Sequence, residues 1–126
     1  MKKINRNFFK PSMFICLCLM TVTLISATVC RPPGPPGKPE IVDVGKDWCT
    51  IEFTAPGDDG GCAITGYRIS YRYKGGLWNV WTSKAKLFRV RLVGLLEGKN
   101  VQFRVSAINA EGEGEPSEPS KMVLLQ

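Results

Sequence analysis

DDGGCAITGY, at residues 58–67, is a tight turn that leads directly into a strand. Gly and Asp adopt turn conformations at low cost, and from Tyr67 onward apolar and polar residues alternate. A second turn-rich stretch, NAEGEGEPSEP, occupies residues 109–119. Alternation with period 2 is typical of half-buried strands, and no stretch sustains the 3.6-residue apolar period of a helix. The sequence therefore predicts an all-β chain whose function is binding and not chemistry.

The alternation from Glu40 onward predicts seven strands that form one antiparallel, immunoglobulin-like β-sandwich. The expected bounds are 40–45, 48–55, 65–73, 78–83, 87–94, 100–109 and 119–125. In each strand one face supplies the expected core. These inward residues are Cys49, Ile51, Phe53, Tyr67, Ile69, Tyr71, Tyr73, Phe88, Val90, Leu92, Val101, Phe103, Val105 and Ala107.

The N-terminal 30 residues have a different composition. Four basic side chains lie within residues 1–10, and residues 11–30 carry no charge. This is the pattern of a secretory signal peptide, with small residues near the expected cut at 26–28. The apolar core at 13–29 is also just long enough to span a bilayer, so a retained signal anchor is one alternative and a misassigned start is another.

The chain therefore divides into three parts. Residues 1–30 are predicted to be a signal peptide or signal anchor, residues 31–39 a Pro/Gly-rich, extended linker, and residues 40–126 one domain. The basic residues belong largely to the first part, because residues 31–126 hold 13 basic against 11 acidic residues, a net charge of +2. Such a small excess does not imply a nucleic-acid or membrane partner.

Cysteine and histidine usage bears on compartment and chemistry. The chain has no His, which excludes catalysis and metal binding by imidazole. Cys49 falls on the apolar face of a strand and Cys62 in the loop beyond its far end, about 20 Å away by strand geometry, too far for a disulfide. Both are interpreted as free thiols, which favours a reducing compartment. The signal peptide and the thiols thus point in opposite directions.

Motifs in order along residues 32–125 resemble the fibronectin type III family. They are PPGPPGKP at 32–39, the Pro56 to Tyr67 loop with its DDGG and ITGY elements, Trp78, GL-x-EG at 94–98, FRV at 103–105 and NA-x-G-x-GEPS at 109–117. The loops are most similar to modules of titin, twitchin and myosin-binding protein C, and next to those of neural cell-adhesion molecules.

Two residues depart from the pattern that this resemblance implies. Phe53 stands where the family has a core Trp on the second strand, and Val101 stands where a Tyr usually opens the sixth strand. The hydroxyl of that Tyr ties down the preceding corner, so its loss is expected to cost about 1 kcal/mol.

Candidate partner-binding residues lie on outward positions. Arg68, Arg72 and Lys74 share the outer face of the third strand, and Arg104 lies outward on its expected neighbour. This face is a candidate docking surface for a protein and, weakly, for an anionic polysaccharide; a solvated sheet face is the alternative. Trp78 and Trp81 have an odd separation, so one of them is expected to be exposed as a candidate interface anchor.

A second basic run comprises Lys84, Lys86, Arg89 and Arg91. No aromatic residue is expected to share a face with either basic run, so nucleic acid is not a predicted partner. Asp58 and Asp59 are adjacent in a Gly-rich turn and are expected to shape it. No catalytic residue, cofactor or metal ligand is predicted, and the chain is not expected to be an enzyme.

Three functions follow as hypotheses. The first is a secreted or cell-surface adhesion or recognition module that binds a protein through its loops or its basic face. The second is a structural module of an intracellular muscle scaffold of the titin and twitchin type. The third is a soluble ligand or inhibitor that acts in another organism's tissue. A membrane is a partner only if the N-terminal segment is retained as an anchor.

Overall fold

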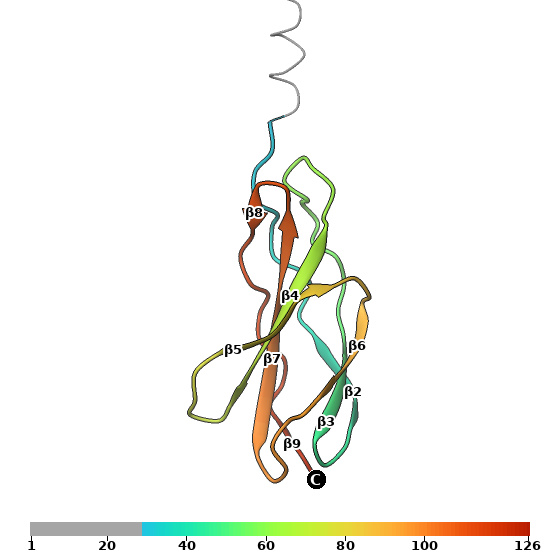
Figure 1. Cartoon of the computed structure of the whole chain (residues 1–126), viewed down its shortest axis with the longest axis vertical. Coiled ribbons are helices and arrows are strands. Elements are labelled where there is room, and N and C mark those ends of the chain that lie inside the picture. The colour runs from blue at the N-terminus through green and yellow to red at the C-terminus, as the bar shows by residue number, and fades with distance from the viewer. Residues whose placement is uncertain (1–28) are drawn as a thin grey trace, which may run out of the picture.

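The computed structural model describes residues 29–126, and the predictions for residues 1–28 lie outside that range. Within the described residues, eight strands form two antiparallel layers of one elongated sandwich (Figure 1). The strands are β2 (Glu40–Val44), β3 (Trp48–Glu52), β4 (Gly66–Tyr73), β5 (Asn79–Ala85), β6 (Arg89–Val93), β7 (Asn100–Asn109), β8 (Gly112–Glu113) and β9 (Val123–Leu124). No helix that could cross a membrane occurs in this part of the chain.

One sheet has the order β2-β3-β6, and the other has the order β5-β4-β7-β8, with β9 also paired to β7. The predicted all-β sandwich is confirmed. The predicted last strand, 119–125, is reduced to β9, because Pro116 and Pro119 have no amide hydrogen to continue a ladder. The segment between β8 and β9 still follows β7: the amides of Gly114, Ser117 and Ser120 donate to its carbonyls.

The core between the sheets contains most of the expected residues. Those that are buried are Cys49, Ile51, Phe53, Tyr67, Ile69, Leu92, Val101, Phe103, Val105 and Ala107. Tyr71, Tyr73 and Val90 are only partly buried and pack against this cluster. Phe88 was expected inside and is 46% exposed, because β6 begins one residue after it.

Neighbouring aromatic residues compensate for the two departures from the family pattern. Phe53 packs edge-on against Tyr67 and Phe88, with ring centroids 5.0 and 5.6 Å away, and so fills the site expected for a Trp. Tyr73 on β4 lies opposite Val101 on β7, and its hydroxyl accepts a hydrogen bond of 3.0 Å from the amide of Leu96. The corner between β6 and β7 is therefore held by a hydroxyl from the adjacent strand.

Candidate functional site

The outer face of the β5-β4-β7 sheet carries an arginine–tryptophan stack. The guanidinium carbons of Arg72 on β4 and Arg104 on β7 lie 4.7 and 4.4 Å from the ring centroid of Trp78. Ser70 pairs with Arg104 and Arg72 with Gln102, so the two arginines are diagonal neighbours on one face. The chain between β4 and β5 brings Trp78 over them. The sequence prediction that no aromatic shares this basic face is therefore wrong.

A hydrogen-bond chain fixes the stack from below. The Arg72 Nε donates to the Gln102 Oε1 at 2.7 Å, and the Gln102 Nε2 donates to the carbonyl of Ser120 at 3.2 Å. Because this contact uses only the Nε of Arg72, the two terminal amino groups remain available as donors. The guanidinium is thus held in position without losing its capacity to bind an anion.

The other predicted members of this face differ in their contacts. Arg68, toward the opposite end of β4, is paired with the Glu113 carboxylate of β8 at 3.2 Å. Lys74 is exposed just beyond β4. The structure therefore brings Arg72, Arg104 and Trp78 together, leaves Lys74 nearby in sequence, and neutralises Arg68.

Trp81 is not part of this surface. It packs against the hydrophobic core, and its Nε1 donates a hydrogen bond of 3.1 Å to the carbonyl of Val93 on β6. This contact joins the edge strand β5 to the other sheet. Of the two tryptophans, Trp78 lies on the outer face, and Trp81 closes the edge of the sandwich.

The second basic run does not form one surface. Lys84 lies on β5, whereas Arg89 and Arg91 lie on β6 in the other sheet. Arg89 is 3.6 Å from the Glu52 carboxylate, and the Arg91 guanidinium lies 4.2 Å from the ring centroid of Trp48. Charges that are adjacent in sequence are therefore separated by the turn between the two sheets.

A disulfide lies at the end of the sandwich where the chain enters, which is called the pole below. The prediction that Cys62 is a free thiol is therefore wrong. Cys62 is bonded to Cys30, with a Cα–Cα separation of 5.7 Å, whereas Cys49 is free and buried. The exclusion of a Cys49–Cys62 bond was right, but the sequence pattern placed Cys30 in the signal peptide. The segment after Cys30 folds back along the loop that follows β3: the amides of Arg31, Gly34 and Gly37 donate to its carbonyls.

The predicted linker at 31–39 is thus extended but lies against the module. Close approach requires glycine: a Cβ on Gly60 would collide with the carbonyl oxygen of Arg31, and one on Gly114 with that of Pro33. The Arg31 guanidinium also forms an ion pair of 3.0 Å with Asp58. In Figure 1 this segment enters beside β8, at the opposite end from the C-terminus.

Asp58 and Asp59 shape the turn as expected. Their carboxylates accept hydrogen bonds of 2.8 Å from the amides of Gly60 and Gly61. The bond from Gly60, followed by the Arg31 guanidinium, lowers the pKa of Asp58. Since these carboxylates serve backbone and guanidinium donors, they are not arranged as a catalytic pair.

Asn109 is a structural residue whose role the sequence did not reveal. Its side-chain amide is buried and donates to the carbonyls of Arg31 at 2.7 Å and Asp59 at 2.9 Å, while its Oδ1 accepts from the amides of Glu111 and Gly112. It therefore links the entering segment and the two turn-rich loops. The only signal was its place at the start of the second turn-rich stretch.

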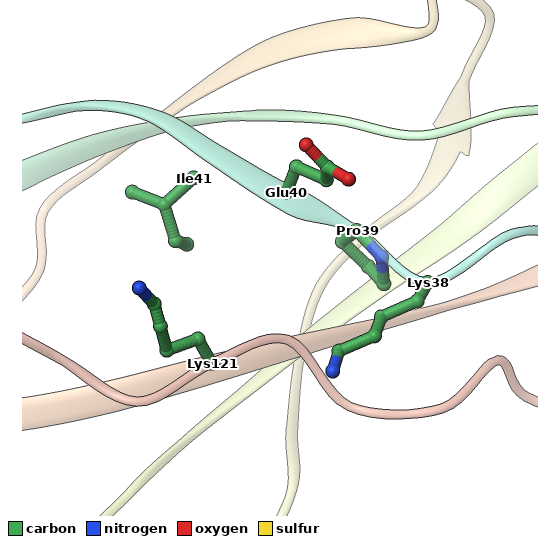
Figure 2. A pocket seen from close by; sticks show the side chains of 5 residues that line it. All are labelled: Lys38, Pro39, Glu40, Ile41 and Lys121. Carbon is green, nitrogen blue, oxygen red and sulfur yellow. The ribbon is translucent and has the colours of Figure 1, made fainter.

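A groove of about 360 Å³ runs between β2 and the segment that precedes β9. Figure 2 shows Lys121 extending toward Ile41, Lys38 extending elsewhere along the groove, and Glu40 directed away. The two ammonium groups do not converge, so the groove offers no built anion site. Residues 29–126 also contain no group of His, Cys, Asp and Glu side chains able to hold a metal ion.

The fold and its surface define a small immunoglobulin-like sandwich module with a preorganised cationic face. Residues 34–123 match the family model of the fibronectin type III domain, and the chain belongs to that family. The resemblance of its motifs to this family is confirmed.

Three curated relatives match most of this chain but are far longer than it. The chain is 32% identical to the titin homolog of Caenorhabditis elegans over 81% of its length, and 36% identical to human slow-type myosin-binding protein C over 71%. It is 35% identical to human Brother of CDO over 75% of its length. This chain spans only a small part of each relative: 8% of the myosin-binding protein C, 9% of Brother of CDO, and a share of the titin homolog that rounds to 0%.

Solved structures that contain titin and twitchin domains superpose on this chain. A crystal structure of titin domains superposes with a TM-score of 0.73 at 32% identity, over 76% of this chain and 33% of that one. The twitchin kinase region from C. elegans gives a TM-score of 0.72 at 32% identity, over 75% of this chain and 17% of that one.

Proposed function

We propose that this chain is an exported, non-catalytic module that binds a protein partner outside the cell or at its surface. The observation that carries the proposal is the Cys30–Cys62 disulfide. Disulfides persist in oxidising compartments and are rare in the cytosol, so this bond supports the same destination as the signal-peptide pattern of residues 1–30. The two features agree if the signal peptide is cut before Cys30, so that the exported chain keeps both bonded cysteines.

The contacts at the same pole favour partner binding through the sheet face. The loop that follows β3 and the loop between β7 and β8 are occupied by the chain's own entering segment, through Asn109, Arg31 and the disulfide. The outer face of β4 and β7 instead carries the Arg72 and Arg104 guanidinium groups, which stack on Trp78. A partner therefore meets fewer existing contacts on the sheet face than at this pole.

A second candidate is a structural module of an intracellular muscle scaffold. It is favoured by the identities of 32% to the titin homolog and 36% to myosin-binding protein C. Under this hypothesis Cys30 and Cys62 are both reduced in the cell, and the pole is held by its hydrogen bonds and the Arg31–Asp58 ion pair.

Expression of the full chain with a C-terminal tag in animal cells tests the proposal. The expected result is tagged protein in the medium, or on the cell surface, with the Cys30–Cys62 bond formed. A signal-peptide deletion from residue 1 to 28 is the matched control and is expected to remain inside. Full-length protein that stays reduced in the cytosol would support the muscle-scaffold hypothesis and refute export.

A further inference from the structure

The outer sheet face carries cations that the module itself does not neutralise. Within residues 29–126 the arginines in ion pairs are Arg31, Arg68 and Arg89. Arg72 and Arg104 have no carboxylate partner there, and they meet the Trp78 ring instead. Stacking on an indole is a weak interaction, and it leaves the edge of a guanidinium able to donate to an anion.

These guanidiniums are held in place before any partner arrives. Trp78 restrains both, and Gln102 fixes Arg72 through its Nε. A free arginine side chain loses rotamer entropy when it binds, so restraint in the unbound state lowers the cost of association. Planar guanidiniums also bind carboxylates with two parallel hydrogen bonds, which a lysine cannot do.

Two exposed apolar residues, Leu77 and Val80, come from the same short segment as Trp78. Val80 pairs with Ser70, and Ser70 pairs with Arg104, so Val80 and Arg104 lie in one row across β5, β4 and β7. Val80 is 52% exposed, and Leu77, beside Trp78, is 84% exposed. Exposed aliphatic groups beside paired cations match a protein segment that presents carboxylates and apolar side chains together. A sulfated polysaccharide has no apolar complement to offer them.

We propose that the Arg72–Trp78–Arg104 face binds an acidic protein segment, with its carboxylates on the two guanidiniums and its apolar side chains against Val80 and Leu77. This inference rests on the proposed function, because it names the chemistry of the partner that a protein-binding module would take. Lys74, exposed beyond β4, adds a longer-range positive charge.

Binding of a short labelled peptide that alternates glutamate and valine tests the proposal by fluorescence anisotropy. The tagged full chain is used in the form that the cells deliver, so the result does not depend on where the protein is found. Arg72→Gln/Arg104→Gln is expected to weaken binding by at least about tenfold. Lys84→Gln/Lys86→Gln removes the same charge at the other end of β5, next to the partner of Tyr67 and away from the Trp78 stack, and is expected to change binding by less than about twofold.

Two variants at constant charge separate geometry from charge. Arg72→Lys/Arg104→Lys keeps both positive charges and is expected to bind several-fold more weakly, because lysine neither stacks flat nor donates bidentately. Trp78→Leu leaves both arginines in place and is expected to weaken binding in the same direction, with thermal unfolding confirming the fold.

Three results would overturn the proposal. One is an equal loss in the arginine and the Lys84/Lys86 variants, which would reduce the effect to net charge. Another is full binding by the lysine variant. The third is binding of heparin or a single-stranded oligonucleotide, but not of the peptide, which would assign the face to a different class of anion.

Discussion

The pole where the chain enters and the outer face of β4 and β7 use similar side chains in opposite ways. At the pole, Arg31 is paired with Asp58, Asn109 has its amide and carbonyl groups engaged, and Cys62 is bonded to Cys30. On the face, within residues 29–126, Arg72 and Arg104 have an aromatic contact but no carboxylate. The comparison teaches that polar residues in the turn-rich loops are structural, while the available chemistry lies on the sheet.

Breaking the disulfide should have the largest effect on the pole. Cys62→Ser is expected to lower the free energy of unfolding by about 3 kcal/mol, because the bond closes a loop with a sequence separation of 32 and constrains the unfolded chain. Urea denaturation measures the change, with Cys30→Ser as the matched variant of equal effect. Peptide binding by the folded variant should be unaltered. A loss below about 1 kcal/mol would contradict the stabilising role given to the bond.

Asn109 should give the next largest effect. Asn109→Ala removes hydrogen bonds to two loops from a side chain that is 3% exposed, so a loss of about 2 kcal/mol is expected. Asn109→Asp keeps the acceptor for the Glu111 and Gly112 amides but cannot donate to Arg31 and Asp59. Thermal melting of the wild type and the two variants would refute the bridging role if the Asn109→Asp variant matched the wild type.

Alkaline pH should lower the free energy of unfolding through two titratable groups in the core. Burial, and secondarily the Asp43 charge, raises the pKa of Cys49 from 9.0 to about 11, and burial raises the pKa of Tyr67. As the pH rises, the unfolded chain loses these protons before the folded chain does. The contribution of the Cys49 thiol to stability is therefore fully present below pH 9 and is lost as the pH rises toward 11. The Cys49 contribution is about 3 kcal/mol at most, since the pKa differs by about two units between the folded and unfolded states.

Cys49→Ala is the control for that pH dependence. It should unfold with a flatter stability profile over the same interval, while Tyr67 keeps the remaining slope. An unchanged slope in the variant would contradict the role given to the thiol.

Removal of the Tyr73 hydroxyl should have the smallest effect on the free energy of unfolding. Tyr73→Phe removes the hydrogen bond to the Leu96 amide and is expected to cost about 1 kcal/mol. Tyr71→Phe lies on the same strand and is the control, with little change expected. Equal losses in the two variants would mean that the bond to Leu96 does not stabilise the corner.

Strand positions and most core residues were predictable, because alternation reports which face of a strand is buried. Cys49, Ile51 and Phe53 are examples. The Trp78 stack was not predictable, because it depends on the path between β4 and β5, where alternation gives no direction. Cys30 was missed because a composition boundary at residue 30 was treated as a structural boundary, although the segment beyond it folds back onto the loop.

Peptide mapping of the tagged protein without reduction is the most direct test of an exported, disulfide-closed module. Protein from the medium should yield one fragment that joins the segment containing Cys30 to the one containing Cys62, and Cys49 should be alkylated after denaturation. The N-terminus of that protein should lie at or before Cys30, since a cut after it would remove the bonding partner. Secreted protein that begins after residue 30, or intracellular protein with Cys30, Cys49 and Cys62 all alkylated, would contradict the account.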